Sequence, residues 1–142
     1  MSGEARSEPR PRCFLAFDYG TRRIGVAGGN TLLGTAQALG AVDATGEARW
    51  AAIAGLVAEW KPDALVVGVP FHPDGAEHDN TRRARAFGRQ LHGRFGLPVH
   101  EVDERYSTTA ALAAGARDAD AAAAAIILQQ FLDALPAPEA DA

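Results

Sequence analysis

Carboxylates that could act together stand at three positions of the chain: Asp18, Glu104 and Asp120. Asp18 ends the apolar run of residues 13–17, Glu104 ends a later predicted strand, and Asp120 lies near the start of the last predicted helix. A carboxylate at the end of a buried strand must leave the core or be held there by a cation. Mg²⁺ prefers such oxygen ligands, and two such ions clamp the attacking and leaving oxygens of a phosphoryl displacement. We therefore expect these acids, if the fold gathers them, to hold metal.

Each of these acids also has an ordinary structural interpretation. Asp18 is compatible with a solvated surface position, and Asp120 in a first helical turn is favoured by the helix dipole. Successive strand residues face opposite sides of a sheet, so Asp103 and Glu104 cannot both point toward one site. We predict Glu104 as the ligand and expect Asp103 to bond to backbone or to Arg105.

The segment that follows Asp18 predicts a tight turn, after which residues 24–27 return as a second strand. The polar side chains that this turn presents beside the carboxylate are Thr21, Arg22 and Arg23. We expect them to lie on the substrate side of the site. The segment lacks the Gly-Lys-Ser/Thr ending of a P-loop, which excludes Walker-type nucleotide binding.

Strands and helices are expected along the chain in the order of a mixed α/β sheet. Short apolar runs predict strands, and helical spacing of apolar residues predicts amphipathic helices. The predicted strands cover residues 13–17, 24–27, 32–39, 64–69 and 99–103, and the predicted helices cover residues 46–60, 81–95 and about 119–135. A three-stranded antiparallel meander followed by β–α–β units predicts a five-stranded sheet with parallel strands and helices on both faces.

The bulk composition of the 142 residues favours a single domain, which we expect to span residues 13–135. Residues 1–12 and 136–142 lack an apolar period and predict disordered tails. The single cysteine, Cys13, excludes an intramolecular disulfide. Because the sequence shows neither a secretory signal nor an apolar run of membrane-spanning length, it predicts a cytoplasmic protein with no membrane partner.

The net charge of −4 argues against nucleic-acid binding through overall charge alone. Five arginines nevertheless crowd one segment: Arg82, Arg83, Arg85, Arg89 and Arg94. They are compatible with a face that tracks phosphates, or with a solvated helix face paired with Glu77, Asp79 and Glu101, and both interpretations stay open. His72 is a candidate substrate-binding residue because its loop follows the C-terminal end of a predicted central strand.

Four short motifs occur along the sequence. Each motif alone is a weak signal, but the four in this order are highly specific. They are residues 17–27 (FDYGTRRIGVA), residues 67–70 (VGVP) with Asp74-Gly75, residues 103–108 (DERYST), and Asp120 followed by residues 124–129 (AAIILQ). These motifs resemble the YqgF/RuvX family of Holliday-junction-resolvase-like nucleases, whose members are described as pre-16S rRNA nucleases. The resemblance spans nearly all of the expected domain and implies an RNase H-like fold, in agreement with the predicted order of elements.

The resemblance implies a metal-dependent nuclease that hydrolyses phosphodiester bonds in structured nucleic acid. The implied ligands of Mg²⁺, or of Mn²⁺ in its place, are Asp18, Glu104 and Asp120, and the side chains implied on the substrate side are Thr21, Arg22 and Arg105. Precursor 16S rRNA, processed at its 5′ end in ribosome biogenesis, is favoured over DNA junctions as the substrate. Ribosome-assembly factors are further expected partners, and the expected oligomeric state is a monomer or weak homodimer.

The sequence departs from the family pattern at three places. His72 stands where members usually carry Asn, and Ala110 stands where they usually carry an acid. Residues 111–119 are alanine-rich where members have a longer, lysine-rich segment. These departures and the acidic balance favour a non-catalytic adaptor in ribosome assembly, transcription or DNA repair. A Holliday-junction resolvase is a further alternative. An ATPase or sugar kinase of the actin type, which residues 18–21 resemble, would need two domains of this fold, and one domain of this length cannot form their cleft.

Overall fold

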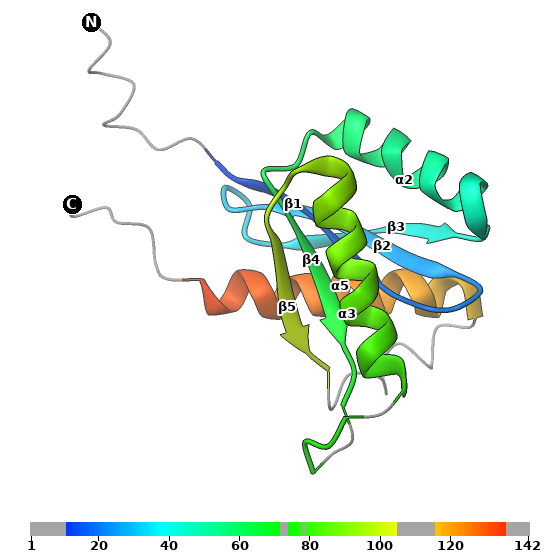
Figure 1. Ribbon diagram of the computed structural model, residues 1–142. Coiled ribbons are helices and arrows are strands. Elements are labelled where there is room, and N and C mark those ends of the chain that lie inside the picture. Colours follow the sequence, from blue (N-terminus) through cyan, green and yellow to red (C-terminus); the bar gives the residue numbers. More distant parts are fainter. Residues whose placement is uncertain (1–10, 72–73, 78, 105–115, 136–142) are drawn as a thin grey trace, which may run out of the picture.

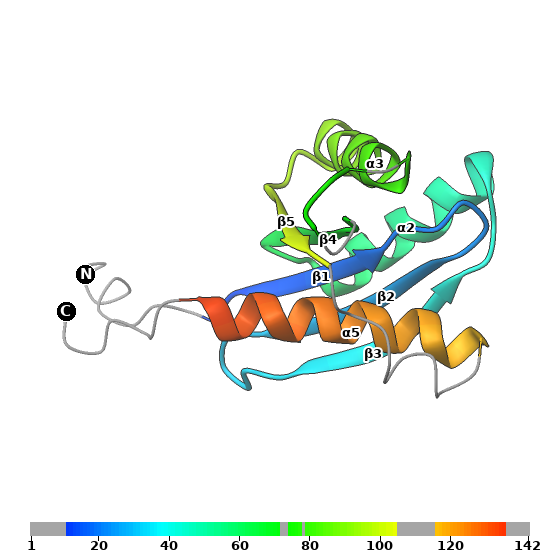
Figure 2. The ribbon, with the colours of Figure 1, turned by 90° about the horizontal axis from the view of Figure 1, so that it is seen from below.

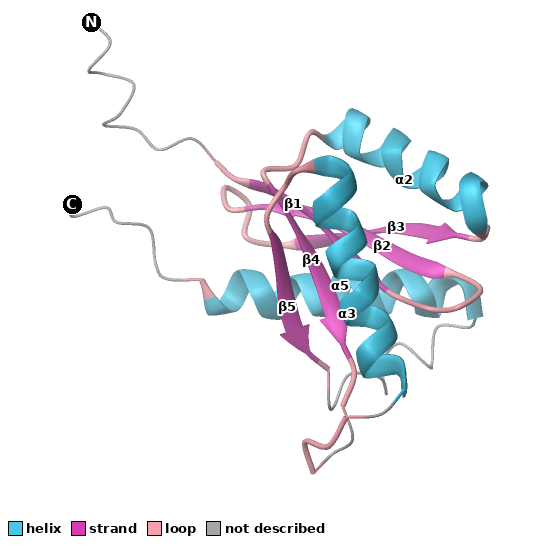
Figure 3. Ribbon diagram, viewed as in Figure 1, coloured by secondary structure: helices cyan, strands magenta, loops and turns pink. Residues whose placement is uncertain are grey.

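The computed structural model describes residues 11–71, 74–77, 79–104 and 116–135 of the chain. Five strands form one sheet in the order β3-β2-β1-β4-β5 (Figure 3). The strands are β1 (Cys13–Asp18), β2 (Ile24–Asn30), β3 (Ala36–Val42), β4 (Ala64–Val69) and β5 (Val99–Asp103). The helices are α2 (Gly46–Trp60), α3 (Asp79–Phe95) and α5 (Ala116–Ala134). Of the tails expected at residues 1–12 and 136–142, residues 1–10 and 136–142 lie outside the described residues. Arg12, in contrast, is held to Thr31 by two hydrogen bonds, so the ordered chain begins before residue 13.

Antiparallel and parallel pairings are combined in this sheet. β1 and β3 both run antiparallel to β2, whereas β4 runs parallel to β1 and β5 runs parallel to β4. Asp18 stands opposite Gly25 of β2, and Phe17 stands opposite Val67 of β4. The predicted mixed sheet, an antiparallel meander extended by parallel strands, is therefore confirmed.

Helices cover both faces of the sheet (Figures 1 and 2). α5 lies along one face of the sheet, and α2 and α3 lie on the other. Alternation along β1 divides the core between these faces. Phe14 and Ala16 pack in the cluster that contains Ile127 of α5, whereas Leu15 and Phe17 pack in the cluster that contains α2 and α3 residues. Every residue of β4 is buried, as expected of a central strand covered on both faces.

The third strand begins later than the sequence predicts, at Ala36 instead of residue 32. The side-chain oxygen of Asn30 accepts the backbone N–H of Leu33 at 2.8 Å, and the Asn30 carbonyl accepts the N–H of Gly34 at 2.9 Å. Gly34 has a φ of 71°, a value that glycine adopts without strain. Residues 31–33 therefore form a turn, and the apolar side chain of Leu33 is 70% exposed.

Several elements begin or end at other residues than predicted. α3 begins at Asp79 and α5 begins at Ala116, two and about three residues earlier than predicted, and α5 ends one residue earlier, at Ala134. β1 and β2 end at Asp18 and Asn30, one and three residues later than predicted, while α2, β4 and β5 have the predicted bounds. An acid such as Asp79 in the first turn complements the helix dipole. Among the described helices, none is long and apolar enough to cross a membrane.

Candidate active site

Asp18 ends β1 on the sheet face that α5 covers. Phe14 and Ala16 of β1 pack in the cluster on that face, and the two-residue period of a strand gives Asp18 the same direction. Burial raises the pKa of the Asp18 carboxyl to about 6, and the negative charge of Asp120 adds to the increase. Asp18 and Asp120, which are 102 residues apart in the sequence, therefore interact electrostatically.

Asp120, in the N-terminal part of α5, is held close to β2 by a glycine and an arginine. The backbone of Asp120 packs so closely on Gly25 that a Cβ atom at this glycine would overlap the Asp120 carbonyl. Gly25 is also the residue paired with Asp18. The Nε atom of Arg23 donates to Oδ2 of Asp120 at 2.8 Å. The absence of a side chain at Gly25 thus permits the helix to bring Asp120 next to the end of β1.

Glu104 follows β5 and reaches the same face across a second glycine. Its backbone N–H donates to the Val69 carbonyl at 3.0 Å, which extends the parallel pairing of β5 with β4 by one residue. A Cβ atom at Gly68 would overlap the Glu104 carboxylate and the side chain of Ile127. The Glu104 carboxylate therefore occupies the space that Gly68 leaves free beneath α5.

Asp103 lies on the opposite face of the sheet from Glu104. Glu101, which shares the face of Asp103 by alternation, bonds Arg85 of α3, whereas the ring of His100 contacts Phe131 of α5. Of the two neighbouring acids, only Glu104 thus shares a face with Asp18 and Asp120. Its role as a metal ligand stays a prediction.

The described residues contain no three His, Cys, Asp or Glu side chains close enough together to hold a metal ion. The structure brings Asp18 and Asp120 together and places Glu104 on the same face without completing a three-acid group. The donor set suits Mg²⁺, because carboxylate oxygens are the ligands it prefers. A cation would also favour the ionised form of Asp18, whose pKa is raised first by burial and then by the charge of Asp120. Arg23 supplies a positive charge to Asp120 in this structure.

The residues predicted on the substrate side have different surroundings. Thr21 and Arg22 are exposed in the connection between β1 and β2. Arg23 is partly buried and bonded to Asp120, a contact that the sequence did not indicate. His72 and Arg105 lie outside the described residues, and so does most of the alanine-rich segment of residues 111–119.

Three residues that sequence reasoning did not single out contribute to the site. Gly25 and Gly68 provide space for Asp120 and Glu104, and a glycine inside an apolar strand is the signal that could have identified them. Arg49 of α2 is only 8% exposed and donates to the carbonyls of Gly20 and Thr21. Nothing in the helical pattern around Arg49 distinguishes it from a solvated arginine.

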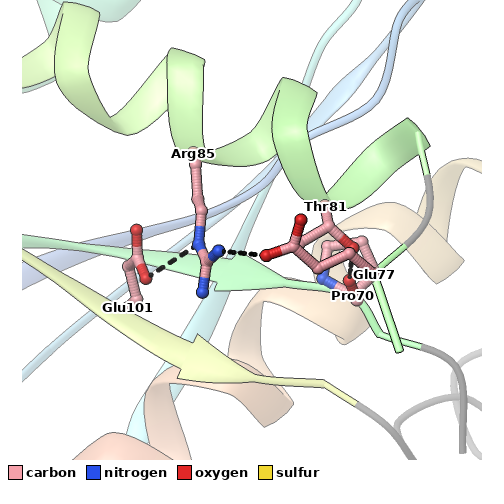
Figure 4. Close-up of polar contacts among 5 residues, drawn as sticks. All are labelled: Pro70, Glu77, Thr81, Arg85 and Glu101. Atoms are coloured by element: carbon pink, nitrogen blue, oxygen red, sulfur yellow. Dashed lines mark hydrogen bonds and ion pairs between the residues drawn. The ribbon is translucent and has the colours of Figure 1, made fainter. Parts of the chain in front are cut away.

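Acidic partners engage part of the arginine-rich segment of α3. Arg85 bonds Glu77 through Nη1 at 2.8 Å and Glu101 through Nε at 3.4 Å (Figure 4). Arg82 likewise bonds Asp79 at 2.8 Å. Figure 4 also shows the hydroxyl of Thr81 donating to the Pro70 carbonyl, which ties the start of α3 to the end of β4. For Arg82 and Arg85, the structure favours the paired, solvated helix face over a phosphate-tracking face.

Comparisons with known proteins agree with this arrangement. A family model described as RuvX, Holliday junction resolvase, matches residues 12–134. A Polaromonas protein named "Putative pre-16S rRNA nuclease" is 66% identical over 123 residues, which cover 87% of this chain and 89% of the relative. A protein of the same name from Albidiferax ferrireducens is 67% identical over 119 residues, covering 84% of this chain and 76% of the relative.

A solved structure supports the fold. RuvC of T. thermophilus, in complex with a Holliday junction substrate, superposes with a TM-score of 0.57 at 18% identity, over 87% of this chain and 94% of the RuvC chain. The expected RNase H-like fold is confirmed by this likeness. With the family model covering nearly all of the described residues and relatives this similar, the chain belongs to the RuvX family of resolvase-like nucleases.

Proposed function

We propose that this chain hydrolyses phosphodiester bonds in structured RNA, with the 5′ end of precursor 16S rRNA as its substrate. The observation that carries the proposal is the Asp18–Asp120 pair, two carboxylates held together by rigid backbone although their charges repel. Burial and the neighbouring charge of Asp120 both disfavour ionised Asp18, and a cation bound by the two carboxylates would offset this cost. The names of the close relatives support the choice of substrate.

The acids of the site would hold one or two Mg²⁺ ions, with Mn²⁺ as a substitute. Asp18 and Asp120 are the first two ligands, and Glu104, on the same face, completes the set by a shift of its side chain. The bound metal would supply an activated water and stabilise the charge on the leaving oxygen. Arg23 would release Asp120 as the metal binds, and Thr21 and Arg22 would contact the phosphate backbone from the exposed turn.

The test is cleavage of labelled precursor 16S rRNA by the purified chain in Mg²⁺, Mn²⁺ or EDTA. We expect Asp18→Asn to lower the metal-dependent rate by roughly 100-fold or more, because removing a charged ligand weakens both metal binding and transition-state stabilisation. Asp43→Asn, which changes an exposed acid between β3 and α2, is the matched control and should cleave at the rate of the unchanged chain. If Asp18→Asn and Asp43→Asn cleaved at the same metal-dependent rate, these carboxylates would be excluded as the catalytic site.

A four-way DNA junction belongs in the same assay, because the family description names a Holliday junction resolvase. A higher kcat/KM on the junction than on precursor rRNA would replace the proposed substrate while keeping the proposed chemistry.

A non-catalytic adaptor is the second candidate function. It is favoured by one observation: Arg23 already engages Asp120, one of the acids that would bind metal. Binding of RNA without cleavage in any of the metal conditions would support the adaptor and contradict the nuclease.

A further inference from the structure

Arg49 is a buried cation for which the proposed chemistry has no role. It lies in the first turns of α2 and is 8% exposed. Its Nε atom donates to the Ala44 carbonyl at 2.9 Å, and Nη2 donates to the carbonyls of Gly20 at 3.3 Å and Thr21 at 3.0 Å. Its guanidinium also lies 5.8 Å from the centre of the Tyr19 ring. Arg49 thus joins α2 to the turn that follows Asp18.

Burial of a guanidinium is costly unless its donors are satisfied. In the described part of the chain, the hydrogen-bond partners of Arg49 are backbone carbonyls and not a carboxylate. Two of these three carbonyls belong to consecutive residues of one short turn. The arrangement therefore fixes the orientation of two neighbouring peptide groups.

The geometry of a peptide group determines where the opposite sides of these two peptides point. In a planar trans peptide the C=O and N–H bonds point in opposite directions. The Gly20 carbonyl shares its peptide with the N–H of Thr21, and the Thr21 carbonyl shares its peptide with the N–H of Arg22. Because both carbonyls point toward Arg49, both N–H groups point away from it, at residues that are exposed.

These two N–H groups are suited to bind an anion. None of the hydrogen bonds found among the described residues uses them as donors. Successive N–H groups that point to one side form a concave site for an anion. A charged donor on the carbonyl of a peptide also polarises that peptide and strengthens its N–H as a donor.

We propose that Arg49 is a positioning residue, which orients the β1–β2 turn so that the N–H groups of Thr21 and Arg22 bind a backbone phosphate of the nucleic acid. This inference rests on the proposed function, since it assigns the phosphate contact of the same site. Arg49 itself does not reach the phosphate. Arg49 affects binding only by orienting the turn.

The test compares Arg49→Met and Arg49→Lys with Arg12→Met in the 142-residue chain. Arg12 precedes β1, at the end of that strand remote from the turn, and lies over the Phe14 ring at 5.0 Å, so its replacement removes an arginine–aromatic contact without touching the turn. Binding is measured in EDTA with a fluorescently labelled RNA hairpin, below the melting temperature of every variant. We expect Arg49→Met to weaken binding by roughly tenfold, as for the loss of a well-oriented polar contact. Arg49→Lys should recover part of the loss, and Arg12→Met should bind normally.

The salt dependence of binding distinguishes positioning from direct contact. An arginine that neutralises a phosphate lowers the slope of log K against log salt by about one when it is removed. We expect Arg49→Met to keep the slope of the unchanged chain. A slope lowered by one, or unaltered affinity in a folded variant, would overturn the proposal.

Two further measurements separate this inference from the proposed function and from a folding defect. In cleavage assays Arg49→Met should raise KM and leave kcat nearly unchanged, as for the loss of an interaction that is equally strong in the ground state and the transition state. A lower kcat at constant KM would contradict the proposal.

If the chain binds RNA without cleaving it, the nuclease proposal fails while the EDTA binding test still decides the role of Arg49. If Arg49→Met does not fold, the test is amide hydrogen exchange in the unchanged chain with and without RNA. Bound RNA should slow the exchange of the Thr21 and Arg22 amides. Exchange that RNA does not slow at these amides would refute the proposal.

Discussion

At the scale of single residues, three acids and two glycines define the candidate site. Burial raises the pKa of Asp18, and Asp120 lies close enough for its charge to add to the increase. Gly25 permits this approach because any side chain there would overlap the backbone of Asp120. Gly68 has the corresponding role for the Glu104 carboxylate. The site thus requires glycine at these two positions as much as it requires its charged side chains.

Replacement of Gly68 by alanine tests this dependence. The added methyl group would overlap the Glu104 carboxylate and Ile127. We expect a loss of roughly 1–3 kcal/mol in the free energy of unfolding, as for overpacked cores, and at least tenfold slower cleavage from the displaced Glu104. Urea denaturation and the precursor-rRNA assay measure the two effects.

A second glycine provides the control for that substitution. No heavy atom lies within 4 Å of a Cβ atom built at Gly55 of α2. Because alanine is the better helix former, Gly55→Ala should stabilise the chain by about 0.5–1 kcal/mol and leave cleavage unchanged. If Gly68→Ala behaved like Gly55→Ala, Glu104 would have no fixed position over β4.

At the scale of elements, α5 is the helix that holds the site face together. It packs against the meander β1–β3 and against β4, and it carries Asp120 near its N-terminal end. One of its side chains also secures the edge strand. Oε1 of Gln129 accepts the N–H of Ala36 at 3.0 Å, and Nε2 donates to the Gly34 carbonyl at 3.0 Å. α5 therefore fixes where β3 begins.

Gln129→Leu should destabilise the protein through these two contacts. It would leave the N–H of Ala36 and the carbonyl of Gly34 without their side-chain partner, at an expected cost of about 1–2 kcal/mol. Gln130→Leu, at the exposed neighbouring position of the same helix, should change the free energy of unfolding by less than about 0.5 kcal/mol. Equal effects of the two substitutions in urea denaturation would show that Gln129 does not secure β3.

At the scale of the whole molecule, the acid pair makes folding depend on pH. Asp18 has a pKa of about 6 in the folded chain, against an ordinary value of 3.8. The folded state therefore binds the proton more tightly than the unfolded state does, and this group favours folding most at low pH. Its contribution is lost as the pH rises from about 4 to 6 and stays constant above that range.

Asp18→Asn should remove this pH dependence. In EDTA at pH 7 we expect the variant to be more stable than the unchanged chain by up to about 3 kcal/mol, which is the cost of ionising Asp18 in the folded state. The difference should shrink as the pH is lowered toward 4. Urea denaturation across this range provides the measurement, and Asp43→Asn is again the control. If the difference in the free energy of unfolding between Asp18→Asn and the unchanged chain does not vary with pH, folding does not raise the pKa of Asp18.

Tertiary interactions also explain where the sequence-based predictions failed. Residues 32–39 have a strand-like composition, but the Asn30 side chain and Gly34 close a turn that delays β3. The bond of Arg23 to an acid 97 positions later in the chain was likewise not foreseen, while its expected place on the substrate side stays a prediction. Local patterns carry no information about such distant partners, because a side chain at a turn can point toward solvent or toward another element.

The sequence by itself determined the order of elements and most of their bounds, and it showed that Asp103 and Glu104 point to opposite faces. These properties follow from apolar periodicity, which depends only on near neighbours along the chain. Only the tertiary structure decided that Asp18 and Asp120 interact, that Arg23 bonds Asp120, and that Arg49 is buried beneath the turn. The reason is physical: such contacts depend on how closely helices approach the sheet, and here glycines at the points of contact determine that approach.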